Sequence, residues 1–378
     1  MATAANNLGK GLGLVVPFFI ADWFSSSSAT DAFFFAYAWV TFITLIFAPV
    51  LESVVVPFIA EERAAGRDVG QFVGRLLPLT AISLAALSLS GWALISLLLP
   101  WVTRFPPGEL PLVRRCLAEL TPLVPLTALS SLIAGTLNAY RSFALPGLSA
   151  GVRAAIVLAC GWLLRDHLGI RAISLGYVAG ELIRLLLLFA ALLASPRLRL
   201  RRADSLFRGM GEFVRKAGQQ TVGMVASELS PIVDKMMATG LGVGAISSLS
   251  YAERLYLIPV IFSSTGFLTT FLSHWSHGYY GEDGSAGLKR SLSRSLRWTA
   301  LLAAGASALL ILVHRPLVGL AYGRTGFPAE SLRQVALLYA VMNLALLPQI
   351  LSYILTRAFL TIKNTRAIRN LGIIRLAG

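Results

Sequence analysis

Long hydrophobic runs, separated by short polar segments, make up most of this chain. A helix needs about 20 predominantly apolar residues to cross the hydrocarbon core of a bilayer, and the chain has ten runs near that length. The first run is short and glycine-rich, and the second is long enough to need tilt. The pattern predicts an all-α polytopic membrane protein with about ten transmembrane helices, at residues 9–24, 31–60, 72–101, 118–140, 145–165, 172–195, 217–240, 248–276, 297–322 and 333–361.

The distribution of basic residues predicts the orientation of these helices. If the N-terminus is cytoplasmic, 22 of the 33 Lys and Arg residues fall in inner segments, Arg153 among them, and 8 fall in outer segments. Cytoplasmic loops carry an excess of Lys and Arg, so we expect a cytoplasmic N-terminus. The net charge of +15 is then explained by topology, and no nucleic-acid partner is needed.

A basic segment divides the chain into two predicted lobes. Seven Lys and Arg residues lie between the sixth and seventh runs, where the anionic inner surface of the membrane would attract them. Spans one and two also resemble spans seven and eight, which suggests a duplicated bundle. The predicted organisation is a six-helix lobe at 1–195, a cytoplasmic linker at 196–216, a four-helix second lobe at 217–361, and a tail or the start of a further helix at 362–378.

Charged residues within the seventh and eighth spans are the main candidate functional groups. Asp234 and Lys235 precede the outer link between the two spans by about as many residues as Glu253 and Arg254 follow it. Both pairs should therefore lie roughly 8 Å below the same membrane face. Two acids and two bases at one depth can neutralise each other, and charges inside a membrane usually face a bundle interior or a water-filled cavity. We expect a polar interior there.

Other acids inside the spans have competing interpretations. Glu181 and Arg184 are three residues apart on one helix, so they either form a structural ion pair or line a cavity. Glu52 lies near the inner end of the second span and could bind a proton or cation, or simply reach the interface. Glu228 lies in mid-span beside Pro231, which leaves a proton-coupled role open.

Motifs for catalysis, cofactors or metals are missing from the sequence. It contains no phosphate-binding loop, no Gly-rich dinucleotide loop and no nucleophile elbow. Cys116 and Cys160 are isolated, and the four histidines lack metal-ligand spacing. We therefore expect a transporter and not an enzyme, with no catalytic residues, cofactor or metal.

The chain contains the segments TDAFF, beginning at Thr30, and YAERL, beginning at Tyr251, together with IFAPVLESVVVPFIAEE, LIAGTLNAYRSFALP and ILTRAFLTIKNTRA. These segments, and the first two most specifically, resemble the MurJ/MviN family of lipid II flippases, which belongs to the multidrug/oligosaccharidyl-lipid/polysaccharide exporter superfamily. The resemblance covers nearly the whole chain. It implies two helical lobes around a central cavity in a bacterial cytoplasmic membrane, where a lipid-linked glycan precursor is flipped by alternating access.

The residues that the family uses for its anionic substrate are only partly present. The arginines of the first two helices are replaced, and the second-lobe charges are largely kept. Val16 and Pro17 stand at an Arg-Asp pair, Thr44 and Leu45 at an arginine pair, Pro49 at an acid, and Lys10 at an earlier arginine. Asp31 and the Glu253–Arg254 pair match the family, and Asp234 stands where some members have an acid. Together, the resemblance and the charges within the spans predict substrate binding by Lys10, Asp31, Asp234, Lys235, Glu253 and Arg254, and possible ion coupling at Glu52 and Glu228.

The substrate and the completeness of the second lobe stay open at this point. The partners expected are lipid II or a related polyprenyl-pyrophosphate saccharide, membrane lipids, and a coupling cation or proton. The alternatives are a drug/cation antiporter of the same superfamily and a non-transporting remnant. The sequence ends where the family begins its eleventh helix, which predicts a fragment, a truncated product or a reduced paralogue.

Overall fold

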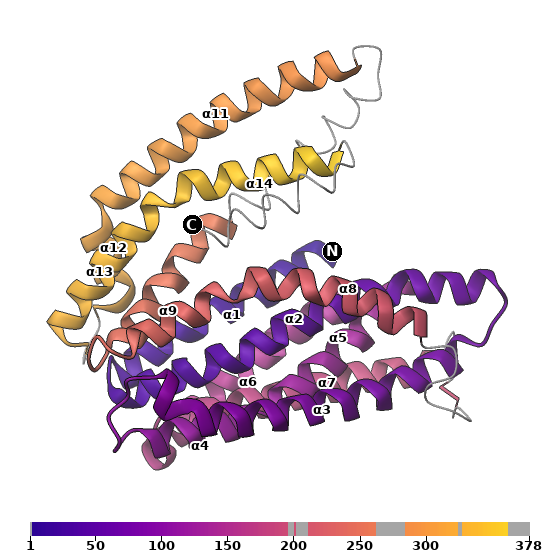
Figure 1. Cartoon of the computed structure of the whole chain (residues 1–378), viewed down its shortest axis with the longest axis horizontal. Helices are drawn as coiled ribbons and strands as arrows, with labels where there is room; N and C mark the ends of the chain where they lie inside the picture. The colour runs from indigo at the N-terminus through magenta and orange to yellow at the C-terminus, as the bar shows by residue number, and fades with distance from the viewer. Residues whose placement is uncertain (1, 196–199, 202–210, 262–283, 324–326, 362–378) are drawn as a thin grey trace. The chain divides into compact units, whose positions relative to one another are not determined.

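The structure, a computed structural model, describes residues 2–195, 200–201, 211–261, 284–323 and 327–361. The described residues form helices joined by turns (Figure 1). The helices of the first half are α1 Ala2–Phe24, α2 Ser28–Ala64, α3 Val69–Val102, α4 Leu110–Leu120, α5 Leu123–Ala139, α6 Ala144–Leu168 and α7 Arg171–Leu193. The others are α8 Gly211–Glu228, α9 Ser230–Ala238, α11 Gly284–Leu312, α12 His314–Tyr322, α13 Ala329–Leu344 and α14 Leu346–Thr361, together with a helix at 245–261.

Seven helical segments among the described residues are long and apolar enough to cross a membrane, so this is a multi-pass membrane protein. They agree with seven of the ten predicted spans, and four of them are longer than the matching apolar runs. The segments are Ser28–Ala64, Val69–Val102, Leu110–Ala139, Ala144–Leu168, Arg171–Leu193, Leu292–Leu312 and Ala329–Leu355. The total of ten stays a prediction, because the predicted span 248–276 lies partly outside the described residues.

The predicted spans 9–24 and 217–240 are not among these seven segments. In α1, side chains are described from Gly13 onward, and Gly13–Phe24 is a short apolar stretch within the predicted span 9–24. The predicted span 217–240 is broken into α8 and α9, because the helix is interrupted at Leu229, two residues before Pro231. Proline has no N–H to donate and its ring clashes with the preceding turn, so it favours such a break.

Contacts divide the chain into two compact units, Met1–Ile246 and Ser247–Gly378. In the first unit α2 contacts α3, α4, α5, α8 and α9, and α7 packs against α4, α5 and α6. Helix α5 approaches α2 closely at Gly135, where a Cβ atom would lie 2.8 Å from the carbonyl oxygen of Glu52. Helices α8 and α9 therefore group with α2, and the predicted lobe boundary at 196–216 stays a prediction.

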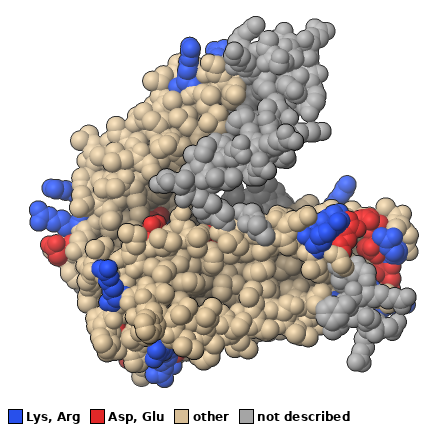
Figure 2. All heavy atoms as spheres, in the orientation of Figure 1, with Lys and Arg blue, Asp and Glu red and all other residues tan. Residues whose placement is uncertain are grey.

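The surface of the first unit has the character of a bilayer-facing surface. Large apolar side chains remain exposed along its helices, including Leu97, Trp101 and Trp162. In Figure 2, charged side chains gather around the α2–α3 turn, whereas the visible surface along α3 is uncharged. A soluble protein rarely exposes such a continuous apolar surface, and lipid hydrocarbon would cover it.

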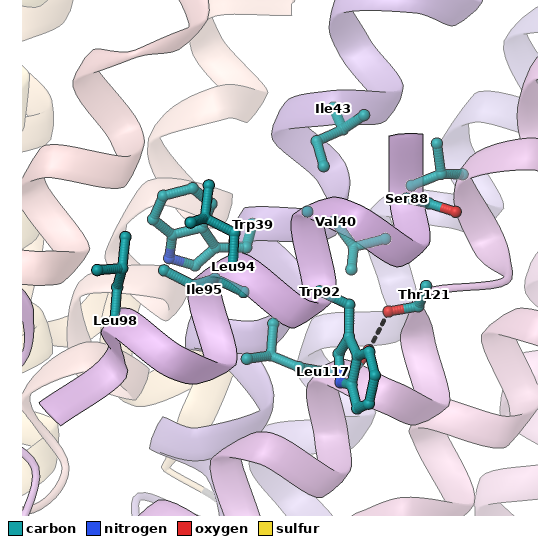
Figure 3. A pocket seen from close by; sticks show the side chains of 12 residues that line it. Trp39, Val40, Ile43, Ser88, Trp92, Leu94, Ile95, Leu98, Leu117 and Thr121 are labelled. Carbon is teal, nitrogen blue, oxygen red and sulfur yellow. Dashed lines mark hydrogen bonds between the residues drawn. The ribbon is translucent and has the colours of Figure 1, made fainter. Parts of the chain in front are cut away.

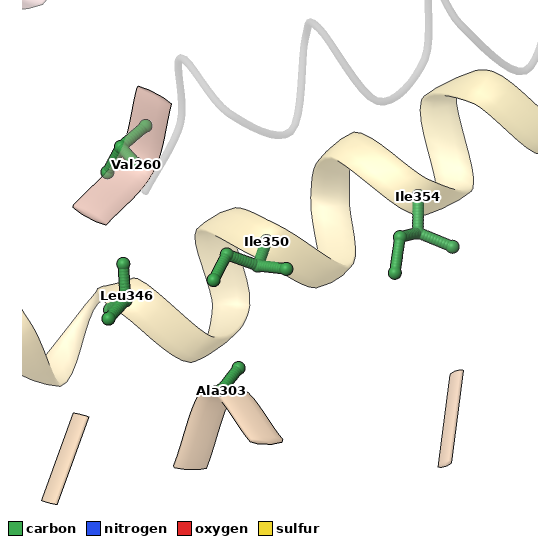
Figure 4. Packing of buried hydrophobic residues seen from close by; sticks show 5 residues of the cluster. All are labelled: Val260, Ala303, Leu346, Ile350 and Ile354. Atoms are coloured by element: carbon green, nitrogen blue, oxygen red, sulfur yellow. The ribbon is translucent and has the colours of Figure 1, made fainter. Parts of the chain in front are cut away.

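The second unit has a small hydrophobic core of its own. Val260, Ala303, Leu346, Ile350 and Ile354 are buried against one another (Figure 4). They bring α11 and α14 together with the helix at 245–261, and α12 and α13 pack beside them. This core orders the part of the second unit that the structure describes.

Candidate functional site

A carboxylate with two arginine partners lies inside the first unit. Glu181 of α7 accepts a hydrogen bond at Oε2 from Nη1 of Arg153 of α6, at 3.0 Å. Its other oxygen, Oε1, accepts from Nη1 of Arg184, also at 3.0 Å. Ser149 completes the group by accepting from Arg184 Nε at 3.2 Å. We call Arg153, Glu181 and Arg184 the buried arginine cluster.

The buried arginine cluster lies deep in the membrane-spanning part of the bundle. Glu181 is fully buried, whereas the side chains of Arg153 and Arg184 are 31% and 13% exposed. Ten residues separate Glu181 from the start of α7 at Arg171, or about 15 Å along the helix axis. A charged group at this depth is costly and is a functional candidate by default.

Aromatic side chains from α2 and α7 border the cluster and show which way Arg153 faces. Tyr37 and Tyr177 are close enough to Arg153 to act on its charge. Their ring centroids lie 4.8 Å apart, and Phe33 packs beside both rings. Arg153 thus lies on the side of α6 where these rings of α2 and α7 pack.

The expected Glu181–Arg184 ion pair is confirmed, and the placement of Arg153 is a correction. The Lys and Arg count assigned Arg153 to an inner segment, but it lies nine residues after the start of α6. The missed signal was its position inside the predicted span 145–165. Close packing permits the contact, because a Cβ atom at Gly180 would lie 2.8 Å from the carbonyl oxygen of Arg153.

A second polar group joins the α1–α2 turn to the segment after α9. The backbone N–H of Gly244 donates to Oδ2 of the buried Asp31 at 2.6 Å. Ser26 Oγ donates to the carbonyl oxygen of Gly244 at 3.1 Å. Gly244 has a φ of +88°, which favours glycine, and a Cβ there would clash with Ser26 Oγ. We call Ser26, Asp31 and Gly244 the clasp.

Two further contacts show which loops share an end of the first unit. The N–H of Arg104, after α3, donates to Thr239 Oγ1 near the clasp segment, at 2.9 Å. At the opposite end of α2, Arg201 pairs with Asp68 at 3.3 Å. Predicted outer loops therefore lie with outer loops, and predicted inner segments with inner segments.

Comparison with known proteins identifies the family. The family model described as "Lipid II flippase MurJ" matches residues 20–377. The chain belongs to this family. The lipid II flippase MurJ of Burkholderia cenocepacia is 26% identical over 368 residues, which cover 93% of this chain and 70% of that protein. The probable lipid II flippase MurJ of Thermotoga maritima is 25% identical over 338 residues, covering 87% and 67%.

Solved structures show the same fold. A structure titled as lipid II flippase MurJ in an inward closed conformation matches with a TM-score of 0.81 at 20% identity, covering 96% of this chain and 76% of that one. An inward-facing multidrug resistance transporter of the MATE family matches with a TM-score of 0.74 at 11% identity, covering 94% and 84%. The resemblance seen in the sequence motifs is confirmed at the level of family and fold.

The MurJ-family charges expected in the seventh and eighth spans fall in different units. In the first unit, Lys235 is buried and Asp234 is exposed, so these neighbours face different surroundings. In the second unit, Glu253 and Arg254 are partly exposed, and Arg254 lies close enough to the Tyr322 hydroxyl for its charge to act there. Mutual neutralisation of the two pairs stays a prediction.

Tyr322 also anchors the first part of the helix at 245–261 through a hydrogen bond and ring packing. Its hydroxyl donates to the carbonyl oxygen of Tyr251 at 3.0 Å. The rings of Tyr251, Tyr322 and Phe327 pack together with centroids 5.3 to 6.1 Å apart. The YAERL motif thus places Glu253 and Arg254 two and three residues after a buried aromatic anchor, Tyr251.

The remaining predicted residues have these positions. Glu52 is not isolated, because its Oε1 accepts from Asn138 Nδ2 of α5 at 3.1 Å. Glu228 is the last residue of α8, at the break before Pro231. Lys10 is in α1, with its side chain outside the described part. Roles of Glu52 and Glu228 in ion coupling stay predictions.

The positions that depart from the MurJ-family arginines carry uncharged side chains here. Val16 and Pro17 are buried, and Leu45 is exposed. Thr44 donates its hydroxyl to the carbonyl oxygen of Val40 at 2.8 Å, one helical turn earlier. These side chains cannot replace an arginine toward an anion.

An apolar cavity of about 140 Å³ opens between α2, α3 and the α4–α5 segment (Figure 3). Trp39, Ile43, Trp92 and Leu117 are among its lining residues, which include no charged side chain. The hydroxyl of Thr121 donates to the carbonyl oxygen of Leu117 at 2.7 Å, drawn as a dashed line in Figure 3. Such a cavity does not suit a charged head group, so the arginine cluster remains the better candidate.

Proposed function

We propose that this chain flips a lipid-linked glycan precursor, lipid II or a related polyprenyl-pyrophosphate saccharide, across the bacterial cytoplasmic membrane by alternating access. The observation that carries the proposal is the match of the lipid II flippase family model to residues 20–377. The curated relatives quoted above bear the same description. The similarity to a MATE transporter, at 11% identity, concerns the fold alone and does not favour the antiporter alternative.

Transport of a fluorophore-labelled lipid II in proteoliposomes tests this proposal. A membrane-impermeant reductant bleaches only the outer leaflet, so an active flippase should make the whole labelled pool bleachable. Protein-free liposomes, and liposomes with a labelled phosphatidylethanolamine, serve as controls. The proposal is refuted if the label in the inner leaflet stays protected from the reductant when the protein is present. This must hold both for lipid II and for a second polyprenyl-pyrophosphate saccharide.

Lys235 and Arg254 are the proposed residues that attract the phosphates, and Asp234, Glu253 and Glu228 are proposed to balance charge or to couple to an ion gradient. Lys10 and Asp31 are further proposed substrate-binding residues. An arginine offers a planar fork for two phosphate oxygens, whereas a lysine is a point charge. Arg254→Lys should therefore yield folded protein that transports at least tenfold more slowly. This is the decrease in rate expected when one charge-assisted hydrogen bond to the substrate is lost. Transport at the wild-type rate, with wild-type expression, would show that Arg254 has a structural role only.

The proposed orientation places the N-terminus in the cytoplasm, with 362–378 on the same side. The Lys and Arg distribution supports it. The contacts of Arg201 with Asp68 and of Arg104 with Thr239 place the predicted inner and outer segments at separate ends of the first unit. After replacement of the two native cysteines, an impermeant maleimide added to whole cells should label single cysteines placed within 25–30, 104–115 or 241–247. It should not label cysteines placed within 196–216. Labelling in that basic segment would reverse the orientation.

A further inference from the structure

The buried arginine cluster holds more positive charge than it neutralises. Glu181 supplies one negative charge to two guanidinium groups, which leaves the cluster with a net charge of +1. A guanidinium carries five N–H donors. Among the described residues, Arg153 uses Nη1 toward Glu181, and Arg184 uses Nη1 and Nε toward Glu181 and Ser149. Most of the donors therefore remain available to a further acceptor.

A structural ion pair would not need this excess charge. Glu181 and Arg184 alone would form a neutral pair on one helix, with both carboxylate oxygens accessible to Arg184 and to neighbouring donors. Arg153 adds an uncompensated cation at a depth where charge is expensive. Its side chain is nevertheless 31% exposed, and it lies near Tyr37 and Tyr177. The exposed part of the side chain is where we expect an anion to contact it.

The same chain contains a similar cluster at a helix end, which serves as a comparison. Glu119 pairs with Arg115 and Arg171, whose side chains are 61% and 28% exposed. Arg171 is the first residue of α7, where water can solvate the excess charge. The two clusters have the same composition but lie at different depths in the membrane. Replacing one arginine in each cluster by glutamine therefore distinguishes an anion-binding site from an ion pair at the surface.

From these observations we propose that Arg153 and Arg184 bind a phosphate or pyrophosphate anion, with Glu181 holding both guanidinium planes in place. Two arginines can each offer paired N–H groups to phosphate oxygens, which is the geometry that planar forks favour. This assignment rests on the proposed function, because it makes the cluster a subsite for the pyrophosphate of a lipid-linked substrate. It also supplies cations in the half of the chain where Val16, Pro17, Thr44 and Leu45 replace the family's charged residues.

Binding of geranyl pyrophosphate to the whole chain in nanodiscs of phosphatidylcholine tests the assignment by calorimetry. Arg153→Gln removes the excess charge and leaves Glu181 paired with Arg184, so the protein should fold. The affinity should fall about tenfold to a hundredfold, as expected for one or two charge-assisted hydrogen bonds. Arg153→Lys should recover part of the loss. Arg171→Gln, the matched change in the other cluster, should leave the affinity unchanged.

Further binding measurements distinguish whether the bound anion belongs to a lipid-linked substrate or to a phospholipid. Tighter binding of geranyl pyrophosphate than of inorganic pyrophosphate assigns the site to a lipid-linked head group. Competition by phosphatidylglycerol in the nanodisc assigns it to phospholipid, which supports anion binding but removes the link to the substrate. Equal affinity in wild type and Arg153→Gln, or an equal loss in Arg171→Gln, overturns the proposal. Binding is measured separately from transport. If the protein transports lipid II but Arg153→Gln binds geranyl pyrophosphate as tightly as wild type does, this inference is refuted and the proposed function stands.

Discussion

Replacing Glu181 by glutamine is expected to lower the free energy of unfolding by about 3–5 kcal/mol, the usual cost of removing one partner from a buried ion pair. Glu181 is fully buried and is hydrogen-bonded to both Arg153 and Arg184. Its loss leaves two cations facing each other inside the membrane-spanning bundle. The measurement is thermal and denaturant unfolding of the purified protein in detergent, with expression level as a second readout.

A control variant and a double variant make this result specific. Glu62→Gln removes a carboxylate from an ion pair with Arg67 near the end of α2, where the arginine side chain is 53% exposed, and should change stability little. Glu181→Gln combined with Arg153→Gln restores the wild-type net charge and should recover part of the loss, which measures the coupling between the two residues. Wild-type stability in Glu181→Gln would show that the ion pairs of Glu181 do not stabilise the folded protein.

Opening of the clasp by Asp31→Asn is the second large expected effect. The buried Asp31 carboxylate accepts the Gly244 N–H at 2.6 Å, and a hydrogen bond to a charged group contributes about 1.5–3 kcal/mol. Loss of this hydrogen bond should shift the equilibrium between the closed and the open clasp by about tenfold to 150-fold. Pulsed electron resonance between spin labels at Ala29 and Val243 measures the change as a new, longer distance.

The matched control is Asp22→Asn, which alters an exposed aspartate in α1 and should keep the wild-type distance. Gly244→Ala should act like Asp31→Asn, because its Cβ would clash with Ser26 Oγ and its φ of +88° disfavours a side chain. A wild-type distance distribution in both Asp31→Asn and Gly244→Ala would rule out the clasp as a conformational device.

The membrane fold and one ion pair could be read from the chain because both depend on local spacing. Apolar runs of sufficient length specify helices that cross a bilayer, and the structure has such helices at Ala144–Leu168 and Arg171–Leu193, close to the predicted limits. Glu181 and Arg184 are one helical turn apart, so their pairing follows from helix geometry alone. The TDAFF and YAERL motifs were likewise sufficient to indicate the family.

Contacts between helices could not be predicted in this way. Arg153 lies 28 residues from Glu181, Glu52 lies 86 from Asn138, and Asp31 lies 213 from Gly244. Hydrophobic periodicity says that a helix is buried in a membrane, but lipid and protein neighbours are equally apolar, so it does not say which helix lies opposite a given residue. Close approach at Gly135 and Gly180, together with the break before Pro231, sets those pairings, and this packing turns separate charges into the buried arginine cluster and the clasp.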